Sequence, residues 1–413
     1  MTATQQTLRF GRPIWVRDAI RGKQRYPSLS GNHATSVAIV GGGMTGALVA
    51  YAFASAGIPT AVLEGGAAGR GSTAASSALL LQEPDVELTE LTNRYGTRTS
   101  RRMWQMSRDS VHALVMLVRR LRIACDLKQC DALYYATDAQ AVARLRSEYE
   151  LRARCGFDAT WLGPGNLRRM TGISGRGAIR THGNAQFDPY RACLGVLRAA
   201  VGAGAQVFER SRVRRIVTER DRVRLWTRDG MLESERVVIA TGYATSEFRP
   251  LAGRFRMYRT YVLTTEPITT RERRELGLSD VMVWDTERPY HYVRWTSEQR
   301  LLLGGGDRLV RPGVRRRQQF KTALEELRAY FETRFPALST IKTEFAWEGL
   351  FATTPDTLPY IGPHRRYPRH WFALGYGGNG MTFGFLAARL LLERWHRAMS
   401  RDRVLFEFGR MRR

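Results

Sequence analysis

The sequence predicts an α/β protein with more than one hydrophobic core. The chain has 413 residues, more than a single core usually accommodates, so two intertwined or tandem domains are expected. Hydrophobic residues make up 43% of the chain, and aromatic residues occur throughout it, as in a folded protein. Residues 36–64 alternate between strand-like and helix-like segments, which indicates a parallel sheet covered by helices.

The first strand of that unit leads directly into a glycine-rich turn. Residues 37–40 (VAIV) form a continuous apolar run, as expected of a strand that is buried on both faces. A GxGxxG pattern follows, with Gly41, Gly43 and Gly46 at its three glycine positions. The first glycine permits a tight turn, the second lets the backbone approach a pyrophosphate, and the third allows close packing of the helix on the strand.

A helix and a second strand complete the unit. Small and apolar residues at 47–56 predict the helix, and residues 60–63 predict a strand that ends on Glu64. An acidic side chain at that place can accept hydrogen bonds from an adenosine ribose. The helix N-terminus, at Met44 and Thr45, offers N–H groups to a diphosphate. The unit therefore predicts a dinucleotide-binding domain, and a glycine-rich turn that binds nothing is the alternative.

Three later segments favour FAD over a nicotinamide cofactor. Residues 69–77 are small or hydroxyl-bearing and suit a loop beside a flavin, and an apolar strand at 237–242 ends in ATG. Residues 375–380 form a second glycine-rich loop that opens a long helix and can place N–H donors at the flavin pyrimidine edge. The residues of the later segments that we expect at the cofactor are Gly71, Ser72, Thr73, Val213, Thr241, Gly242, Gly377, Gly378, Asn379, Gly380, Met381 and Thr382.

The order of these motifs resembles the D-amino-acid oxidase-like family of FAD oxidoreductases. The resemblance covers residues 26–394, and the approach at 26–31 (YPSLSG) is similar to the polyamine-oxidase branch. The chain as a whole resembles the branch that contains gamma-glutamylputrescine, glycine and sarcosine oxidases. It implies a Rossmann-like FAD-binding domain of the glutathione-reductase type, interleaved with a substrate domain built on a mixed or antiparallel sheet with helices. The implied segments are an N-terminal arm at 1–35, an FAD-binding domain at 36–82, 187–242 and 347–395, a substrate-binding domain at 83–186 and 243–346, and a basic tail at 396–413.

The resemblance also implies a reaction, in which a hydride leaves the carbon next to an amine nitrogen and passes to flavin N5. The resulting imine would then be hydrolysed. We expect FAD to be bound without a covalent bond, because Cys193 is the last cysteine and lies far upstream of the C-terminal motif. The loop at residues 72–76 also lacks the histidine that some relatives attach to the flavin.

The expected substrate contacts depart from the family pattern. Phe351 stands where amino-acid oxidases of the family commonly place an arginine that binds the substrate carboxylate, which favours an amine unless Arg294 or Arg259 takes that role. Tyr258 is a candidate pocket wall, with ordinary core packing as the alternative. Because residues 257–278 contain no lysine, His291 is the candidate for activating oxygen, and oxygen or another molecule is the electron acceptor. No metal site is expected.

The net charge of +27 leaves a second function open. A basic flavoprotein could act on an amine linked to transfer RNA or to another anionic polymer, although the arginine clusters accompany no nucleic-acid motif. A non-catalytic FAD-binding protein, or an enzyme acting on a C–OH or C–C bond, are further alternatives. No apolar run is long enough to span a membrane and no secretory signal is visible, so a cytoplasmic location is expected; the oligomeric state stays open.

Overall fold

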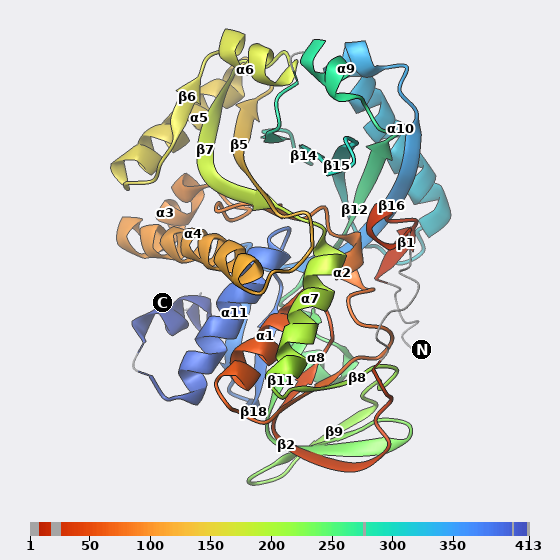
Figure 1. Cartoon of the computed structure of the whole chain (residues 1–413). Coiled ribbons are helices and arrows are strands. Elements are labelled where there is room, and N and C mark those ends of the chain that lie inside the picture. Colours follow the sequence, from red (N-terminus) through yellow and green to blue (C-terminus); the bar gives the residue numbers. More distant parts are fainter. Residues whose placement is uncertain (1–7, 18–25, 276–277, 399, 411–413) are drawn as a thin grey trace.

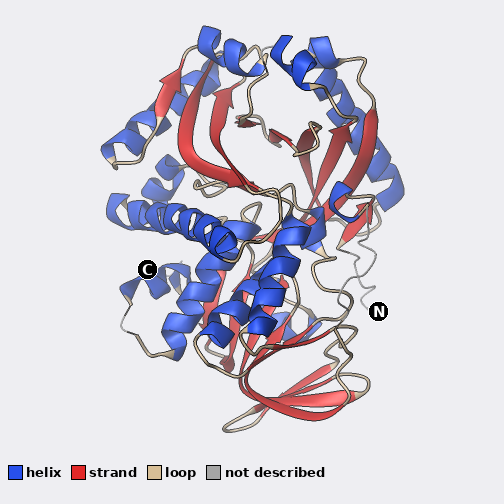
Figure 2. Cartoon of the chain, in the orientation of Figure 1, coloured by secondary structure: helices blue, strands red, loops and turns tan. Residues whose placement is uncertain are grey.

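The protein folds around two β-sheets that occupy opposite halves of the molecule, as Figure 2 shows. The computed structural model describes residues 8–17, 26–275, 278–398 and 400–410. Among these residues, one sheet has eight strands and the other has ten, and helices pack around both. The predicted α/β fold class is confirmed.

Parallel strands form the centre of the eight-stranded sheet. Its strands, in spatial order, are β17 (Tyr360–His364), β18 (Tyr367–Leu374), β11 (Gly230–Gly242), β2 (Gly31–Val40), β3 (Thr60–Leu63) and β8 (Gln206–Phe208), and β10 (Val223–Trp226) and β9 (Arg215–Thr218) continue from β11. The neighbours from β18 to β8 are parallel, whereas β17, β10 and β9 pair in antiparallel fashion. Val37, Ala38 and Ile39 of β2 have 0% exposure, which explains the uninterrupted apolar run.

Three helices cover this sheet and lie side by side in Figure 1, and they are α1 (Met44–Ser55), α7 (Pro189–Gly202) and α11 (Gly380–Trp395). Nine of the twelve residues of α1 are buried, because α7 and α11 flank it and the sheet lies beneath it. Asp188 caps the N-terminus of α7, and its carboxylate accepts the N–H groups of Tyr190 and Arg191 at 2.9 Å.

The ten-stranded sheet is almost entirely antiparallel. Its strands, in spatial order, are β1 (Arg9–Gly11), β16 (Thr343–Thr353), β12 (Arg256–Thr265), β15 (Leu301–Leu309), β14 (His291–Trp295), β13 (Met282–Asp285), β5 (Lys128–Ala136), β7 (Gly177–Gln186) and β4 (Leu79–Leu80), with β6 (Thr160–Leu162) paired to β7. Among these described strands only β13 and β5 are parallel neighbours. Tyr261 of β12 and Phe331 of α10 (Arg316–Arg334) have 0% exposure in one apolar cluster, so α10 packs on this sheet.

The other helices lie at the edges of the two sheets and between them (Figure 1). They are α2 (Ser72–Ala75), α3 (Leu88–Tyr95), α4 (Thr97–Arg120), α5 (Ala139–Arg154), α6 (Pro164–Thr171), α8 (Arg249–Ala252) and α9 (Thr270–Glu275), together with the 3-10 turns η1 (Ile14–Val16), η2 (Ser246–Phe248), η3 (Pro336–Leu338) and η4 (Arg401–Phe406). None of the helices described combines the length and apolar character that crossing a bilayer requires.

The chain passes between the two sheets several times, at points that differ in part from the expected boundaries. Residues 347–353, expected in the FAD-binding domain, continue β16 and pair with β12 in the ten-stranded sheet. The same sheet receives β4, and also β1 from the expected N-terminal arm. Apolar alternation identifies a strand but not the sheet that it joins, so these short assignments needed the tertiary structure.

The described part of the C-terminal segment docks on the eight-stranded half. Phe406 has 0% exposure, and the ring of Phe408 stacks on Tyr360 with centroids 4.5 Å apart. The guanidinium of buried Arg410 donates to both oxygens of the Asp356 carboxylate at 2.7 Å. This pair ties the end of the chain to the loop that joins β16 to β17.

Candidate active site

A large cavity lies between the two sheets. Its volume is about 1340 Å³, and both halves of the molecule contribute to its lining. The eight-stranded half supplies the residues that follow β2 and β3 and the end of β11, and the ten-stranded half supplies side chains of β12, β14, β15 and β16. Ligands of parallel sheets bind beyond the carboxyl ends of the strands, which is where this cavity is found.

The turn between β2 and α1 presents backbone to the cavity. Gly41 has a φ of +113°, and a side-chain carbon there would stand 2.7 Å from the carbonyl oxygen of Ala240. A side chain at Gly46 would collide with the carbonyl oxygen of Gly41, so only glycine lets α1 pack at this angle. Gly43 and the start of α1 therefore form a cradle free of side chains, which fits a pyrophosphate.

Two backbone N–H groups fix the carboxylate of Glu64 at the end of β3. Its Oε2 accepts from Gly42 at 2.8 Å, and its Oε1 accepts from Gly66 at 2.7 Å. Glu64 lines the cavity, as do Arg212 and Val213. The carboxylate stands where the ribose of a dinucleotide is recognised in folds of this kind.

Hydroxyl groups support the cradle from two further loops. The Thr73 hydroxyl oxygen accepts the N–H of Met44 at 3.0 Å, and the Ser72 hydroxyl donates to the Leu350 carbonyl oxygen at 2.8 Å. At the end of β11, the Thr241 hydroxyl donates to a neighbouring carbonyl oxygen at 2.8 Å. These loops bring Gly71, Ser72, Thr73, Thr241 and Gly242 to the cavity.

The second glycine loop faces the same cavity at the start of α11. The N–H of Gly378 donates to the Asp85 carboxylate, and the Asn379 amide donates to the Glu83 carbonyl oxygen at 2.9 Å. Gly377 has a φ of +58°, and a side-chain carbon there would stand 2.7 Å from Asp85 Oδ2. Because these donors are engaged within the protein, the N–H groups of the first turn of α11 are the ones that fit the flavin pyrimidine edge, where negative charge develops on reduction.

Sixteen of the eighteen residues that the sequence assigned to the cofactor line the cavity. The other two support it from behind: Gly46 packs against the glycine turn, and the Thr382 hydroxyl donates to the Leu81 carbonyl oxygen at 3.3 Å. The lining residues that the structure describes include no cysteine, histidine or lysine. The donor set and the side-chain-free cradle thus fit a dinucleotide cofactor.

Aromatic side chains from the ten-stranded sheet and its loops form the other part of the cavity. The rings of Tyr258 and Phe351, both expected at the site, stack at an interplanar angle of 21° with centroids 5.8 Å apart. The rings of Tyr290 and Tyr292 lie 6.1 Å apart. Gly304 makes room for Tyr292, because a side chain there would collide with the tyrosine hydroxyl.

Nine charged residues that we did not assign to the site from the sequence also line the cavity, and three of them lie near its tyrosines. Burial raises the pKa of Asp307 to about 7 and the pKa of Asp85 to about 6. Arg288 is the third. Asp307 directly follows three glycines in β15, and glycine inside a strand often marks a close approach, so a signal existed for it. No local pattern distinguishes Asp85 or Arg288.

Arg294 lies outside the cavity lining, contrary to expectation. Its guanidinium donates to the carbonyl oxygens of Ser77 at 2.6 Å and Phe187 at 3.0 Å, and burial lowers its pKa to about 10. Arg259 pairs with buried Glu348 at 3.4 Å. Both guanidinium groups are engaged within the protein, so neither is placed to bind a substrate carboxylate.

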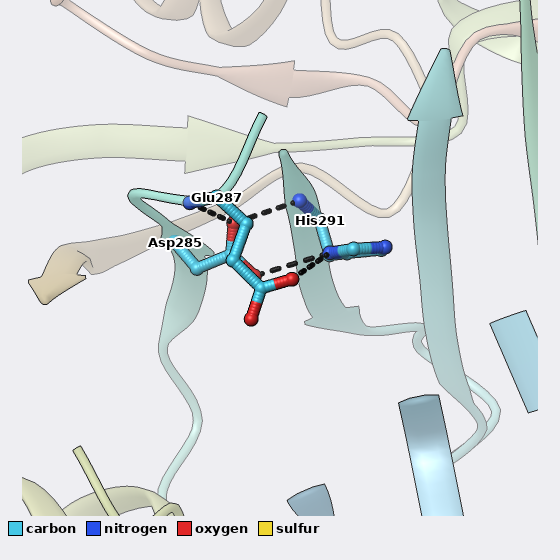
Figure 3. Close-up of side chains that lie close together, drawn as sticks. All are labelled: Asp285, Glu287 and His291. Atoms are coloured by element: carbon cyan, nitrogen blue, oxygen red, sulfur yellow. Dashed lines mark hydrogen bonds and ion pairs between the residues drawn. The ribbon is translucent and has the colours of Figure 1, made fainter. Parts of the chain in front are cut away.

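His291 belongs to a separate polar cluster with Asp285 and Glu287, which Figure 3 shows. The Asp285 carboxylate accepts the backbone N–H groups of Glu287 and His291 at 3.1 and 3.0 Å, and His291 Nδ1 lies 3.2 Å from it. The imidazole stacks on Tyr330 with centroids 3.8 Å apart, and Glu287 pairs with Arg334. These internal partners account for the grouping, and His291 is not among the residues that line the cavity.

Comparison with known proteins agrees with this geometry. Residues 36–394 match the family described as FAD dependent oxidoreductase. The chain is 28% identical over 383 residues to gamma-glutamylputrescine oxidoreductase of Escherichia coli strain K12, covering 89% of this chain and 85% of that protein. It is 26% identical to glycine oxidase of Bacillus licheniformis, covering 83% of this chain and 88% of that protein.

Solved structures share the fold. Glycine oxidase from Geobacillus kaustophilus superposes with a TM-score of 0.77 at 22% identity, covering 92% of this chain and 98% of that chain. L-proline dehydrogenase from P. horikoshii has a TM-score of 0.76 at 20% identity, covering 94% of this chain and 99% of that chain. The family match includes both glycine loops and the strands between them. The chain therefore belongs to the FAD-dependent oxidoreductase family and is an oxidoreductase that uses FAD.

Proposed function

We propose that the protein oxidises the C–N bond of a small amine or amino-acid-like molecule to an imine, which water then hydrolyses. The observation that carries this proposal is the single cavity that joins the nucleotide cradle at residues 41–46 to an aromatic pocket. Similarity to glycine oxidase and gamma-glutamylputrescine oxidoreductase supports the bond type. FAD, when bound, supplies the hydride acceptor at its N5 atom.

The protein's own groups orient the substrate and exclude water. The stacked rings of Tyr258 and Phe351 form an apolar wall that holds the reacting carbon against the cofactor side of the cavity. Phe351 has no charge with which to bind a carboxylate, and Arg259 and Arg294 are paired elsewhere. We therefore favour an amine over a simple α-amino acid.

Non-covalent binding of FAD, a cytoplasmic location and oxygen or another small molecule as electron acceptor are parts of the same proposal. Cys193 lies behind the glycine turn, where its thiol donates to the Gly42 carbonyl oxygen at 3.8 Å, and it does not line the cavity. Four cysteines without a disulfide support a reducing compartment.

The visible spectrum of the purified protein tests the proposal. The oxidised flavin band at about 450 nm should bleach when a substrate amine is added under anaerobic conditions. Readmission of air then shows whether oxygen restores the band. A yellow protein that no amine or amino acid bleaches would contradict the proposed reaction, although not the binding of FAD.

A further inference from the structure

The cavity is acidic although the protein is strongly basic. The chain has a net charge of +27. Seven acidic side chains and three arginines line the cavity among the residues described. One of these arginines, Arg152, is buried and pairs with Glu83 of the same lining at 3.3 Å and with Glu148 at 2.8 Å. With this pair set aside, six acidic side chains and two arginines remain. The surplus of negative charge is therefore a property of the cavity and not of the composition.

One carboxylate oxygen of Asp307 receives no hydrogen bond from the described residues. Its Oδ1 atom is buried and accepts no hydrogen bond from the part of the chain that the structure describes. Asp307 follows the glycine run of β15, and Thr260 and Tyr292 are beside it. An unpaired carboxylate oxygen away from bulk water is unfavourable. A ligand that donates a hydrogen bond here would remove that cost.

Asp85 lies near Tyr290, whereas Asp307 lies near Tyr292. Its carboxylate accepts the N–H of Gly378, and the side chain is open to the cavity. A carbon added to Gly378 would lie 2.8 Å from Asp85 Oδ2 and 3.2 Å from the Tyr290 hydroxyl, so these two groups are neighbours. Tyr292 then leads from Tyr290 towards Asp307. The negative charge of Asp85 adds to the effect of burial in raising the pKa of Asp307.

Two carboxyl groups within electrostatic range of each other, with tyrosine rings beside them, fit one ammonium group. Ammonium groups form charge-assisted hydrogen bonds with carboxylates and are attracted to the faces of aromatic rings. A carboxylate at the far end of a substrate would be repelled by the same pair. The charge of Arg288 acts on Asp85 and also on Tyr134 and Glu87, so it is shared among several groups.

We propose that the cavity selects amines with a second ammonium group at the far end, held at the Asp85 and Asp307 carboxylates. This inference rests on the proposed function, because one of the two nitrogens is the one that becomes oxidised. The discriminating feature of the substrate is thus the charge of the end that does not react.

Three ligands with the same carbon chain test this selection on the FAD-loaded protein, namely 1,4-diaminobutane, butylamine and 4-aminobutanoate. Dissociation constants come from the change in tryptophan fluorescence, since Trp284 lines the cavity, and rates come from anaerobic bleaching of the flavin band. We expect the diamine to bind and react at least about tenfold better than butylamine, and 4-aminobutanoate to be the poorest ligand. If butylamine or 4-aminobutanoate equals the diamine, this inference is wrong while the proposed function stands. If no amine bleaches the flavin, the proposed function fails.

Neutral variants locate the selective charges. Asp307→Asn and Asp85→Asn should each lower the preference for diamine over butylamine about fivefold, measured as the ratio of the two rates within each variant. Asp221→Asn is the matched control, because that side chain is 67% exposed in a surface hairpin. FAD content, read from the absorbance ratio, shows that each variant is folded. An unchanged preference in both folded variants would overturn the proposal.

The preference should also depend on pH. Both ammonium groups of the diamine stay protonated below about pH 9. With pKa values of about 7 for Asp307 and about 6 for Asp85, both carboxyl groups are ionised at pH 8.5 and mostly protonated at pH 5. The diamine preference should therefore fall towards one as the pH is lowered. A parallel His291→Gln series is needed, because His291 also acts on Asp307; Tyr290, Tyr292 and Arg288 do not titrate in this range.

Discussion

The nucleotide cradle can form only because residue 46 is glycine and has no side chain. The Gly41 carbonyl oxygen occupies the space that a side-chain carbon at position 46 would need, and that oxygen belongs to backbone whose position β2 fixes. Relief would require a shift of α1 away from the sheet, which would displace the N–H groups at its start. The same residue therefore controls both packing and cofactor binding.

We expect Gly46→Ala to lower the affinity for FAD at least about tenfold and to destabilise the fold by about 2 kcal/mol. FAD content and the dissociation constant, measured by quenching of flavin fluorescence, report the first effect, and urea unfolding reports the second. Gly202→Ala is the control, because no atom lies within 4 Å of a side-chain carbon added at that position. Normal FAD affinity in Gly46→Ala would show that α1 tolerates the shift.

At the scale of elements, the C-terminal segment fastens a loop that leads into the site. Arg410 donates to the carbonyl oxygens of Leu358 at 2.6 Å and Pro359 at 2.8 Å as well as to Asp356. Asp356 is buried, which by itself would raise its pKa, but the hydrogen bonds and charge of Arg410 hold the pKa below its usual value. The pair therefore stabilises the fold above the unfolded-state pKa of about 4 and loses that contribution as the pH falls below it.

Arg410→Met should destabilise the protein by about 3 kcal/mol at pH 7, because it leaves a buried carboxylate without its partner. The effect should shrink towards pH 3, where Asp356 becomes protonated, and urea unfolding at several pH values measures it. Arg401→Met offers a comparison in the same segment, because Arg401 is exposed. Equal stability of the two variants at pH 7 would mean that the segment does not hold the loop.

Elements whose burial is set locally were predictable, and contacts between distant elements were not. The burial of residues 37–40 and the turn at the glycines beside them could be predicted from the local sequence alone. Phe351 was recognised from its position within a motif. Asp85 reaches the cavity only because the loop after β4 meets the start of α11. Arg294 was misplaced for the same reason: the carbonyl oxygens that bind its guanidinium come from the ends of two other segments.

On the scale of the whole molecule, the cavity joins the two sheets into one unit. Its lining comes from both, and the chain crosses between them repeatedly. Many arginines are paired with acidic side chains, so part of the basic character is neutralised within the fold. The idea that the remaining charge serves an anionic polymer stays a prediction, which a salt-dependent affinity for RNA would support.

FAD should stabilise both halves together. At a free FAD concentration of 100 times the dissociation constant, the gain is about 2.7 kcal/mol, and scanning calorimetry should show a single transition that moves to higher temperature. The apoprotein at the same pH is the control. Two transitions, of which FAD shifts only one, would show that the sheets unfold independently.

The pairing of distant strands also sets the order in which this protein can mature on the ribosome. Arg9 lies opposite Gly349, and Ile39 lies opposite Val238, so the first strands made wait for partners synthesised much later. Meanwhile α1, apolar on nearly all sides, leaves the exit tunnel long before α11 can cover it. Topologies with such long-range contacts fold slowly and expose apolar surface while incomplete. Both sheets can therefore close only near the end of translation, when the last helix emerges.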